Sequence, residues 1–217
     1  MSALRCTLLT DGPTDAVLLY PLRWLLIQNG VSRPIEPAWA DLRPLPQPPK
    51  RLEDRIAAAM DLYPCDLLFI HRDAERLPRE DRVGEIRRAV QRVSSDLFVS
   101  KPYVCIVPVR MTEAWFLFSE PAIRRAVGNP VGAASLALPS LSKIEALPDP
   151  KQTLHELLRA ATELPARRLR KFAWEQAWHR LAQLVEDFSP LRQLSAFAAF
   201  EKELQAVIHA AEWGLVD

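Results

Sequence analysis

The chain has 217 residues, of which 49% are hydrophobic and 25% charged, as in an ordinary globular protein with a sizeable core. Its formal net charge of +1 gives no sign of a globally basic nucleic-acid-binding protein, so any nucleic-acid surface must be local. No segment approaches the ~20 consecutive apolar residues of a membrane span, and the N-terminus lacks a signal-peptide pattern. Its three cysteines show no CxxC spacing, which favours reduced thiols, so we expect a cytoplasmic protein that does not bind membranes.

Strand and helix patterns alternate along the first half of the chain. In chain order they predict strand 4–9, helix 16–29, strand 35–42, helix 51–62, strand 66–70, helix 79–93 and strand 103–109. Pro21 is expected to break or kink the first helix, and Thr112 is expected to cap a helix after the last strand. This alternation predicts an α/β fold, a mostly parallel sheet flanked by helices.

The second half of the chain follows a different pattern. Residues 126–150 are rich in Gly, Pro, Ala and Ser, which is typical of an irregular linker. From residue 151 onward only helical periodicity is found, with leucines three and four positions apart. We therefore expect three parts: an α/β domain over 1–125, the linker over 126–150 and an all-helical C-terminal extension over 151–217.

Acidic side chains follow three of the predicted strands, at the point where each strand ends: Asp11 and Asp15, then Asp73 and Glu75, then Glu113. The carboxyl ends of parallel strands form the edge of a sheet where ligands and metals bind. The sequence therefore predicts a site for a hard divalent cation, Mg²⁺ or Mn²⁺, that assists phosphoryl chemistry. The alternative is that these acids are loop and helix-cap residues, and Asp15 alone is better explained by the dipole of a helical first turn.

Two further side chains lie within the same segment. His71 is a candidate metal ligand or proton carrier, and Arg72 is a candidate phosphate-binding group. The alternative for Arg72 is an ion pair with one of the nearby acids.

A basic and aromatic stretch in the second half is the other candidate. Basic groups neutralise phosphates and aromatic rings stack on bases, so this stretch is a candidate nucleic-acid contact. It contains Arg167, Arg168, Arg170 and Lys171, followed by Trp174 and Trp178. The two tryptophans are four residues apart and share a helix face, which equally favours packing in a core.

Two short motifs resemble those of Toprim domains, which occur in topoisomerases, primases and OLD-type nucleases. D-G-P-T-D at residues 11–15 is similar to their E-G-x-T-D opening, and H-R-D-A-E at residues 71–75 is similar to their D-x-D motif. The resemblance covers residues 4–120, and the stretch 108–115 extends it to small stand-alone Toprim-like families of bacteria, some of which act in anti-phage defence. It implies a Toprim-like sheet.

The resemblance also implies roles for individual residues. Asp11 takes the place of the first-motif glutamate, which acts as general acid/base or metal ligand, and Asp73 and Glu75 take the places of the two metal-binding acids. With His71, proposed above from its position, these acids form the candidate catalytic set. Glu113 completes the candidate metal set as an acid at a strand end, and it matches an acid of the small families to which the resemblance assigns no role. Two departures matter: the first motif has Asp for Glu, and the second ends in Glu for Asp, which changes each side chain's reach by one methylene.

These observations lead to three candidate functions. The first is a Mg²⁺- or Mn²⁺-dependent nuclease, in which Arg72, Arg110 and the basic stretch position the phosphates of DNA or RNA. The second is a non-catalytic module that binds a partner ATPase or senses a ligand, as in defence systems, with its acids paired to arginines such as Arg72 or Arg76. The third is phosphoryl chemistry on a small nucleotide, which a closed pocket would favour. Homo-oligomerisation stays open.

Overall fold

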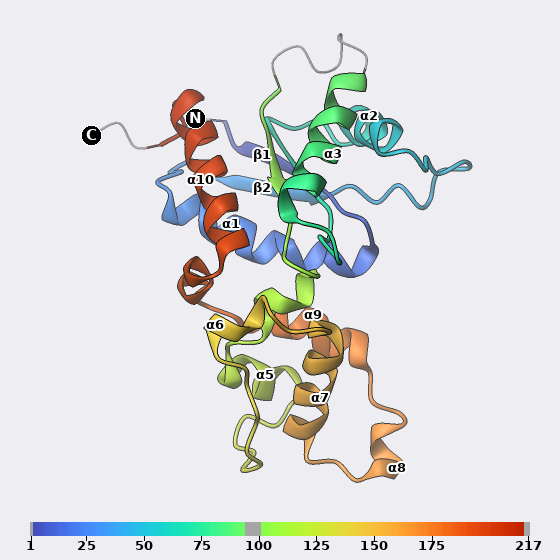
Figure 1. The fold of residues 1–217 in the computed structure, drawn as a ribbon, viewed down its shortest axis with the longest axis vertical. Helices are drawn as coiled ribbons and strands as arrows, with labels where there is room; N and C mark the ends of the chain where they lie inside the picture. The colour runs from blue at the N-terminus through green and yellow to red at the C-terminus, as the bar shows by residue number, and fades with distance from the viewer. Residues whose placement is uncertain (1, 94–100, 215–217) are drawn as a thin grey trace. The chain divides into compact units, whose positions relative to one another are not determined.

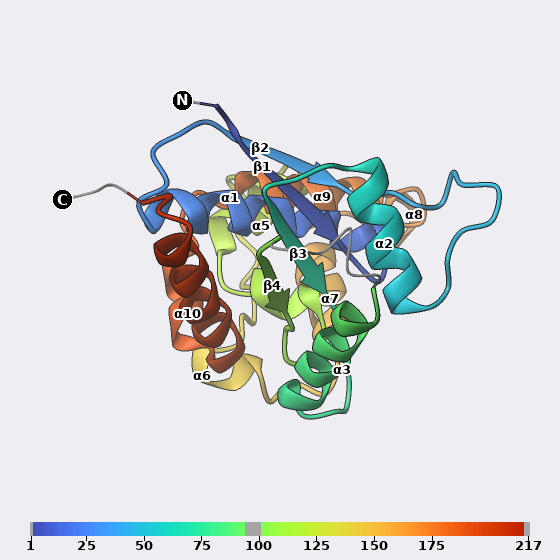
Figure 2. The ribbon, with the colours of Figure 1, turned by 90° about the horizontal axis from the view of Figure 1, so that it is seen from above.

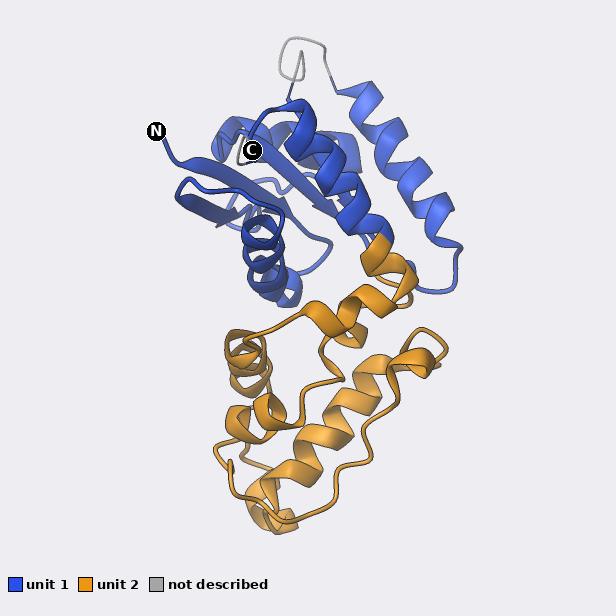
Figure 3. Cartoon of the chain, turned by 90° about the vertical axis from the view of Figure 1, so that its left-hand side faces the viewer, with its two compact units in different colours: residues 1–107, 199–217 blue, residues 108–198 orange. Residues whose placement is uncertain are grey.

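The structure, a computed structural model, describes residues 2–93 and 101–214, which form two compact units that are described separately. The first unit is made of residues 1–107 and 199–217, and the second of residues 108–198 (Figure 3). These divisions differ from the boundaries expected at residues 125 and 150. The last helix belongs partly to each unit, so the α/β unit is discontinuous in the sequence.

The first unit is built on a four-stranded, entirely parallel sheet, as predicted (Figure 1). Its strands are β1 (Leu4–Leu9), β2 (Ile35–Trp39), β3 (Leu67–His71) and β4 (Tyr103–Ile106), in the order β2-β1-β3-β4. The chain therefore moves to one side of β1 for β2 and to the other side for β3 and β4. The gap between the carboxyl ends of β1 and β3 is consequently the topological switch point of the sheet, where ligands of open α/β proteins bind.

Each outer strand is shorter than predicted, and a proline lies in or just after each one. Pro37 lies inside β2, which is tolerated because β2 is an edge strand. β2 ends at Trp39 and β4 at Ile106, each three residues before its predicted end. Pro108 follows β4 and lacks the N–H group that would continue the ladder.

Helices cover both faces of this sheet. Those of the first unit are η1 (Pro13–Leu18), α1 (Leu19–Gln28), α2 (Leu52–Leu62), α3 (Arg79–Arg92) and the later part of α10 (Ser195–Ala210). The predicted helix 16–29 thus starts earlier, as a 3-10 turn at Pro13. Pro21 does not break α1, because it lies in the first turn, where the missing N–H has no helical acceptor.

The two faces of β3 pack against different helices (Figure 2). Ile70 belongs to a buried cluster with Ile56 of α2 and Ile86 of α3. Phe69 points to the opposite face, because side chains alternate along a strand, and its ring meets that of Phe200 of α10 edge-on at 6.3 Å. His71 shares the face of Phe69 and is fully buried.

In the described residues of the second unit, all regular secondary structure is helical, and loops join the helices. It contains η2 (Thr112–Phe116), α5 (Glu120–Ala126), α6 (Leu141–Ile144), α7 (Pro150–Thr162), α8 (Ala166–Leu169), α9 (Trp174–Leu184), η3 (Ser189–Gln193) and the start of α10. Its core is aromatic, with Trp115 against Phe197 at 5.0 Å and Phe116 against Trp178 at 4.8 Å between ring centroids. The prediction that Thr112 caps a helix is wrong: Met111 is the N-cap and Thr112 begins η2.

Across the described parts of both units, no helix is both long enough and apolar enough to cross a membrane.

Candidate functional site

The loops after β1 and β3 leave the sheet next to each other. Leu9 at the end of β1 pairs with Ile70 of β3, so the two loops begin at the same level of the parallel sheet. The prediction that these strand ends share one edge is therefore confirmed. This edge is also the switch point, so the residues that follow each strand line the position where the fold favours ligand binding.

Three side chains form a compact cluster at this edge. The Nε2 atom of His71 lies 3.2 Å from Oδ1 of Asp73, and its Nδ1 atom lies 3.9 Å from Oδ2 of Asp15. One ligand atom from each residue lies within 4.8 Å of the other two, so the group can hold a metal ion. His71 and Asp15 are buried, and Asp73 is partly exposed, which leaves the cluster reachable from the side of Asp73.

The local backbone explains why Asp15 points inward. Thr10 donates a hydrogen bond from Oγ1 to the carbonyl oxygen of Gly12 at 2.7 Å, and the N–H of Gly12 donates to Oδ2 of Asp15 at 3.2 Å. Pro13 then starts η1 immediately, so Asp15 falls in its first turn. Asp15 lies where the helix dipole favours an acid, which was the alternative explanation for this residue, and it also completes the cluster.

The charge of His71 depends on opposing effects. Burial disfavours the imidazolium and by itself lowers the pKa, whereas the hydrogen bond to Asp73 and the charges of Asp73, Asp15 and Asp11 raise it. The carboxylates prevail, so the pKa of His71 lies above its ordinary value. The ring of His71 lies between the two carboxylates and so connects the loop after β3 to η1.

The donor set decides which metals fit. Two carboxylates and one imidazole suit first-row transition ions such as Mn²⁺, whereas Mg²⁺ prefers oxygen ligands alone. A metal here would use one imidazole nitrogen and would displace the proton that His71 shares with its neighbours. Of the two ions expected from the sequence, the donors of Asp15, His71 and Asp73 fit Mn²⁺ better than Mg²⁺.

The other acids in the predicted metal set lie outside this cluster. Asp11 forms ion pairs with Arg55 at 3.4 Å and Arg72 at 3.2 Å. Glu75 has a left-handed backbone, with φ 53°, and its carboxylate pairs with Arg82 at 3.1 Å. One of the two arginines that pair with Asp11 is Arg55 of α2, a partner that the positions of the strand ends did not predict.

The remaining predicted residues divide between the two units. Arg72 pairs with Glu85 at 3.2 Å as well as with Asp11, which agrees with the alternative that it neutralises nearby acids. Glu113 is buried in the second unit, in η2. Arg110 also lies in the second unit, with a left-handed φ of 66°.

The basic stretch of the second unit is exposed. Within residues 2–93 and 101–214, no carboxylate pairs with the members of this basic stretch, which are Arg167, Arg168, Arg170 and Lys171. Trp178 is buried in the core, whereas Trp174 is half-buried and its ring lies 4.3 Å from that of His155. The expectation that both tryptophans pack in a core is therefore met by Trp178, whereas Trp174 stays partly exposed.

Trp174 also lines a pocket of about 350 Å³ with His155, Arg159 and Arg170. Sequence reasoning missed His155 and Arg159, whose spacing of four residues on α7 was the available signal.

The fold and the cluster together define an α/β protein with a carboxylate–imidazole group at the switch point of a parallel sheet. Comparison with protein-family models, with curated proteins and with solved structures found no match for this chain. The resemblance to Toprim domains therefore stays a prediction.

Proposed function

We propose that the chain is a divalent-metal-dependent phosphodiester hydrolase that cleaves nucleic acid, with the metal held by Asp15, His71 and Asp73. The observation that carries this proposal is the convergence of these ligand atoms within 4.8 Å at the sheet's switch point. A metal bound there would polarise a phosphoryl oxygen and supply an activated water. A Toprim-like site is part of the same proposal.

The arginines around Asp11 give the substrate phosphate a place to bind. Asp11 shares its charge between Arg55 and Arg72, whose side chains are 21% and 27% exposed. Like a carboxylate, a phosphodiester presents two oxygens that share one negative charge and can accept a pair of hydrogen bonds from a guanidinium, so it competes for these groups. When the phosphate takes this place, the Asp11 carboxylate loses its cations and becomes available to accept a proton from water.

The basic stretch of the second unit supplies a separate contact with nucleic acid. Binding of a phosphate here need not break an ion pair, because no carboxylate in the described part of the chain pairs with Arg167, Arg168, Arg170 or Lys171. Trp174 and His155 offer ring faces for a base, as in proteins that bind single strands. A near-neutral chain thus carries a locally basic surface.

The test is a cleavage assay on plasmid, single-stranded DNA and tRNA with Mn²⁺ or Mg²⁺. We expect wild-type activity to depend on the metal and to be lost in Asp73→Ala. Asp61→Ala is the matched control, because Asp61 is an exposed acid on α2 of the same unit. Full activity of folded Asp73→Ala, or cleavage that survives EDTA, would show that this cluster is not the catalytic site.

A second candidate function is supported by the ion pairs of the remaining acids. Asp11 is paired with Arg55 and Arg72, and Glu75 with Arg82, which is what a non-catalytic module that binds a partner ATPase or senses a ligand predicts. Calorimetric titration with Mn²⁺ separates the two candidates. A folded protein that neither binds Mn²⁺ nor cleaves any substrate would favour the non-catalytic module. In that case, any activity in anti-phage defence would come from the partner ATPase.

A further inference from the structure

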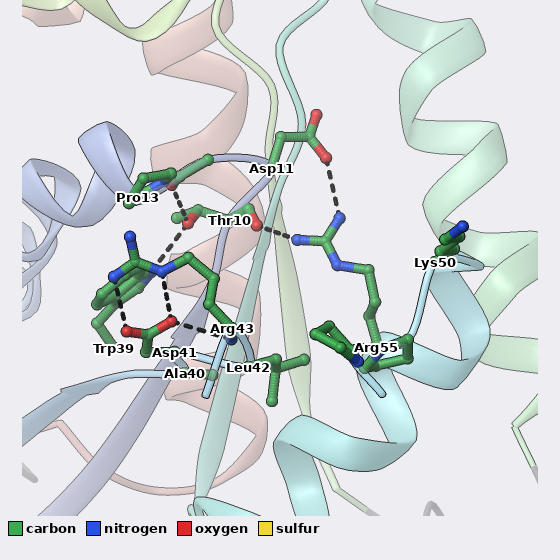
Figure 4. Close-up of a pocket in the computed structure, with 13 residues that line it drawn as sticks. Thr10, Asp11, Pro13, Trp39, Ala40, Asp41, Leu42, Arg43, Lys50 and Arg55 are labelled. Atoms are coloured by element: carbon green, nitrogen blue, oxygen red, sulfur yellow. Dashed lines mark hydrogen bonds and ion pairs between the residues drawn. The ribbon is translucent and has the colours of Figure 1, made fainter. Parts of the chain in front are cut away.

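A pocket of about 330 Å³ lies at the carboxyl ends of β1 and β2 (Figure 4). Its walls come from the turn after β1, from the chain after β2 and from Arg55 of α2. Small-molecule sites range from about 300 to 1,000 Å³, so this pocket has room for a ligand of about one nucleotide. Thr10, Asp11 and Gly12 line it on the side of the cluster.

The pocket has an excess of positive charge. Arg43 and Asp41 neutralise each other through two hydrogen bonds of 2.7 Å. Lys50 is exposed and has no ion pair with any residue in the described ranges 2–93 and 101–214. Arg55 has Asp11 as its carboxylate partner, but Asp11 is shared with Arg72. The other terminal nitrogen of Arg55 donates to the carbonyl oxygen of Thr10. Lys50 is therefore the cation that can meet an anionic ligand directly, and Arg55 can do so where the ligand displaces the carboxylate of Asp11.

Other parts of the lining are apolar or aromatic. They include Trp39, Pro48 and Pro49, and the proline rings restrict the backbone at their positions. The indole is fixed in place because its Nε1–H donates to Oγ1 of Thr10 at 2.9 Å and the guanidinium of Arg43 lies 5.1 Å from the ring centre. Such a wall contacts a planar base or a sugar without losing much side-chain freedom.

We propose that this pocket binds one nucleotide, with its phosphate on Lys50 and Arg55 and its base or sugar against Trp39. This nucleotide would be one residue of the nucleic-acid substrate, so the proposal for the pocket rests on the proposed function. Gly12 connects the two sites: it lines the pocket, and its N–H binds Asp15 of the cluster. A nucleotide held here places the adjoining phosphodiester at the edge of the sheet where Asp11 and Asp73 lie.

The experiment measures adenosine 5′-monophosphate binding by calorimetry, in EDTA so that no metal contributes. Adenosine and inorganic phosphate are the comparison ligands, because they separate the base from the phosphate. Wild type is expected to bind the nucleotide more tightly than either. Lys50→Ala is expected to weaken nucleotide binding about tenfold, the effect of one lost charged hydrogen bond, and to leave adenosine binding unchanged.

Lys143→Ala, at an exposed lysine of the second unit, is the matched control and should bind as wild type does. Equal binding of nucleotide and adenosine, wild-type affinity in Lys50→Ala, or no nucleotide binding at millimolar concentration would each overturn the proposal. Asp73→Ala distinguishes the two proposals. It should bind the nucleotide normally in EDTA, so retained binding with unchanged cleavage would refute only the metal site. Loss of nucleotide binding in folded Asp73→Ala would place the ligand at the cluster and overturn the pocket.

Discussion

Replacing His71 with alanine removes the imidazole that lies between the carboxylates of Asp15 and Asp73. The side chain of His71 is 0% exposed and that of Asp15 only 10%, so water cannot fully replace the lost partner. A hydrogen bond to a charged group contributes about 1.5–3 kcal/mol, and a buried carboxylate left without its cation raises the total cost to about 3–5 kcal/mol. We expect the free energy of unfolding to fall by that amount.

The loss should depend on pH. Although burial lowers the pKa of His71, the carboxylates raise it above the ordinary value. A cation with a raised folded-state pKa contributes its full stability below the unfolded pKa of about 6.5, and this contribution disappears as pH rises through the folded-state pKa. The difference between wild type and His71→Ala should therefore be largest near pH 6 and smaller in alkaline buffer.

Urea denaturation in EDTA at several pH values measures both effects. His209→Ala, at an exposed histidine of α10, is the control and should unfold as wild type does at every pH. A difference below about 1 kcal/mol at pH 6, or one that grows as pH rises, would refute the reasoning that the carboxylates stabilise the protonated form of His71.

Three other predictions concern the basic surface, the thiols and the last helix. Arg170→Ala should weaken binding to single-stranded DNA and reduce the slope of log affinity against log salt by about 0.7, measured by fluorescence anisotropy; an unchanged slope would exclude a phosphate contact there. Burial raises the pKa of Cys6 and of Cys105 to about 12, so neither should react with a thiol reagent at pH 8 until urea unfolds the protein. Phe200→Ala should lower stability by about 3–5 kcal/mol, whereas Lys202→Ala on the exposed side of α10 should change it by less than about 0.5 kcal/mol.

The sheet and its functional edge could be predicted because their signals are local. The run at 4–9 is apolar and short, and β1 has those bounds. His71 and Asp73 come directly after another such run, so the meeting of two acidic loops followed from the parallel arrangement alone. These features depend on neighbouring residues and on a general rule about strand ends.

Which residues form the cluster depends on contacts between residues that are far apart in the sequence. The hydrophobic periodicity of the sequence carries no information about such contacts. Arg55 is 44 positions from Asp11 and looks like any solvated cation of a helix, yet it forms an ion pair with that carboxylate. Asp15 had a sufficient explanation in the helix dipole, and only the hydrogen bonds around Gly12 turn it toward His71. Strand-end reasoning therefore predicted the edge and its acids, but it did not distinguish Asp15, which lies beside His71, from Asp11, which pairs with arginines.

The discontinuity of the first unit has a consequence for its biosynthesis. Residues 199–210 supply Phe200, which packs against Phe69 on the face of β3 that also carries His71, and the ribosome makes them only after all of residues 108–198. At about 5–20 residues per second, the sheet face waits for several seconds or more with its apolar surface uncovered. Folding of the nascent sheet is thus completed after the helical unit has been synthesised, and this interval is when a chaperone or a second nascent chain has access to it.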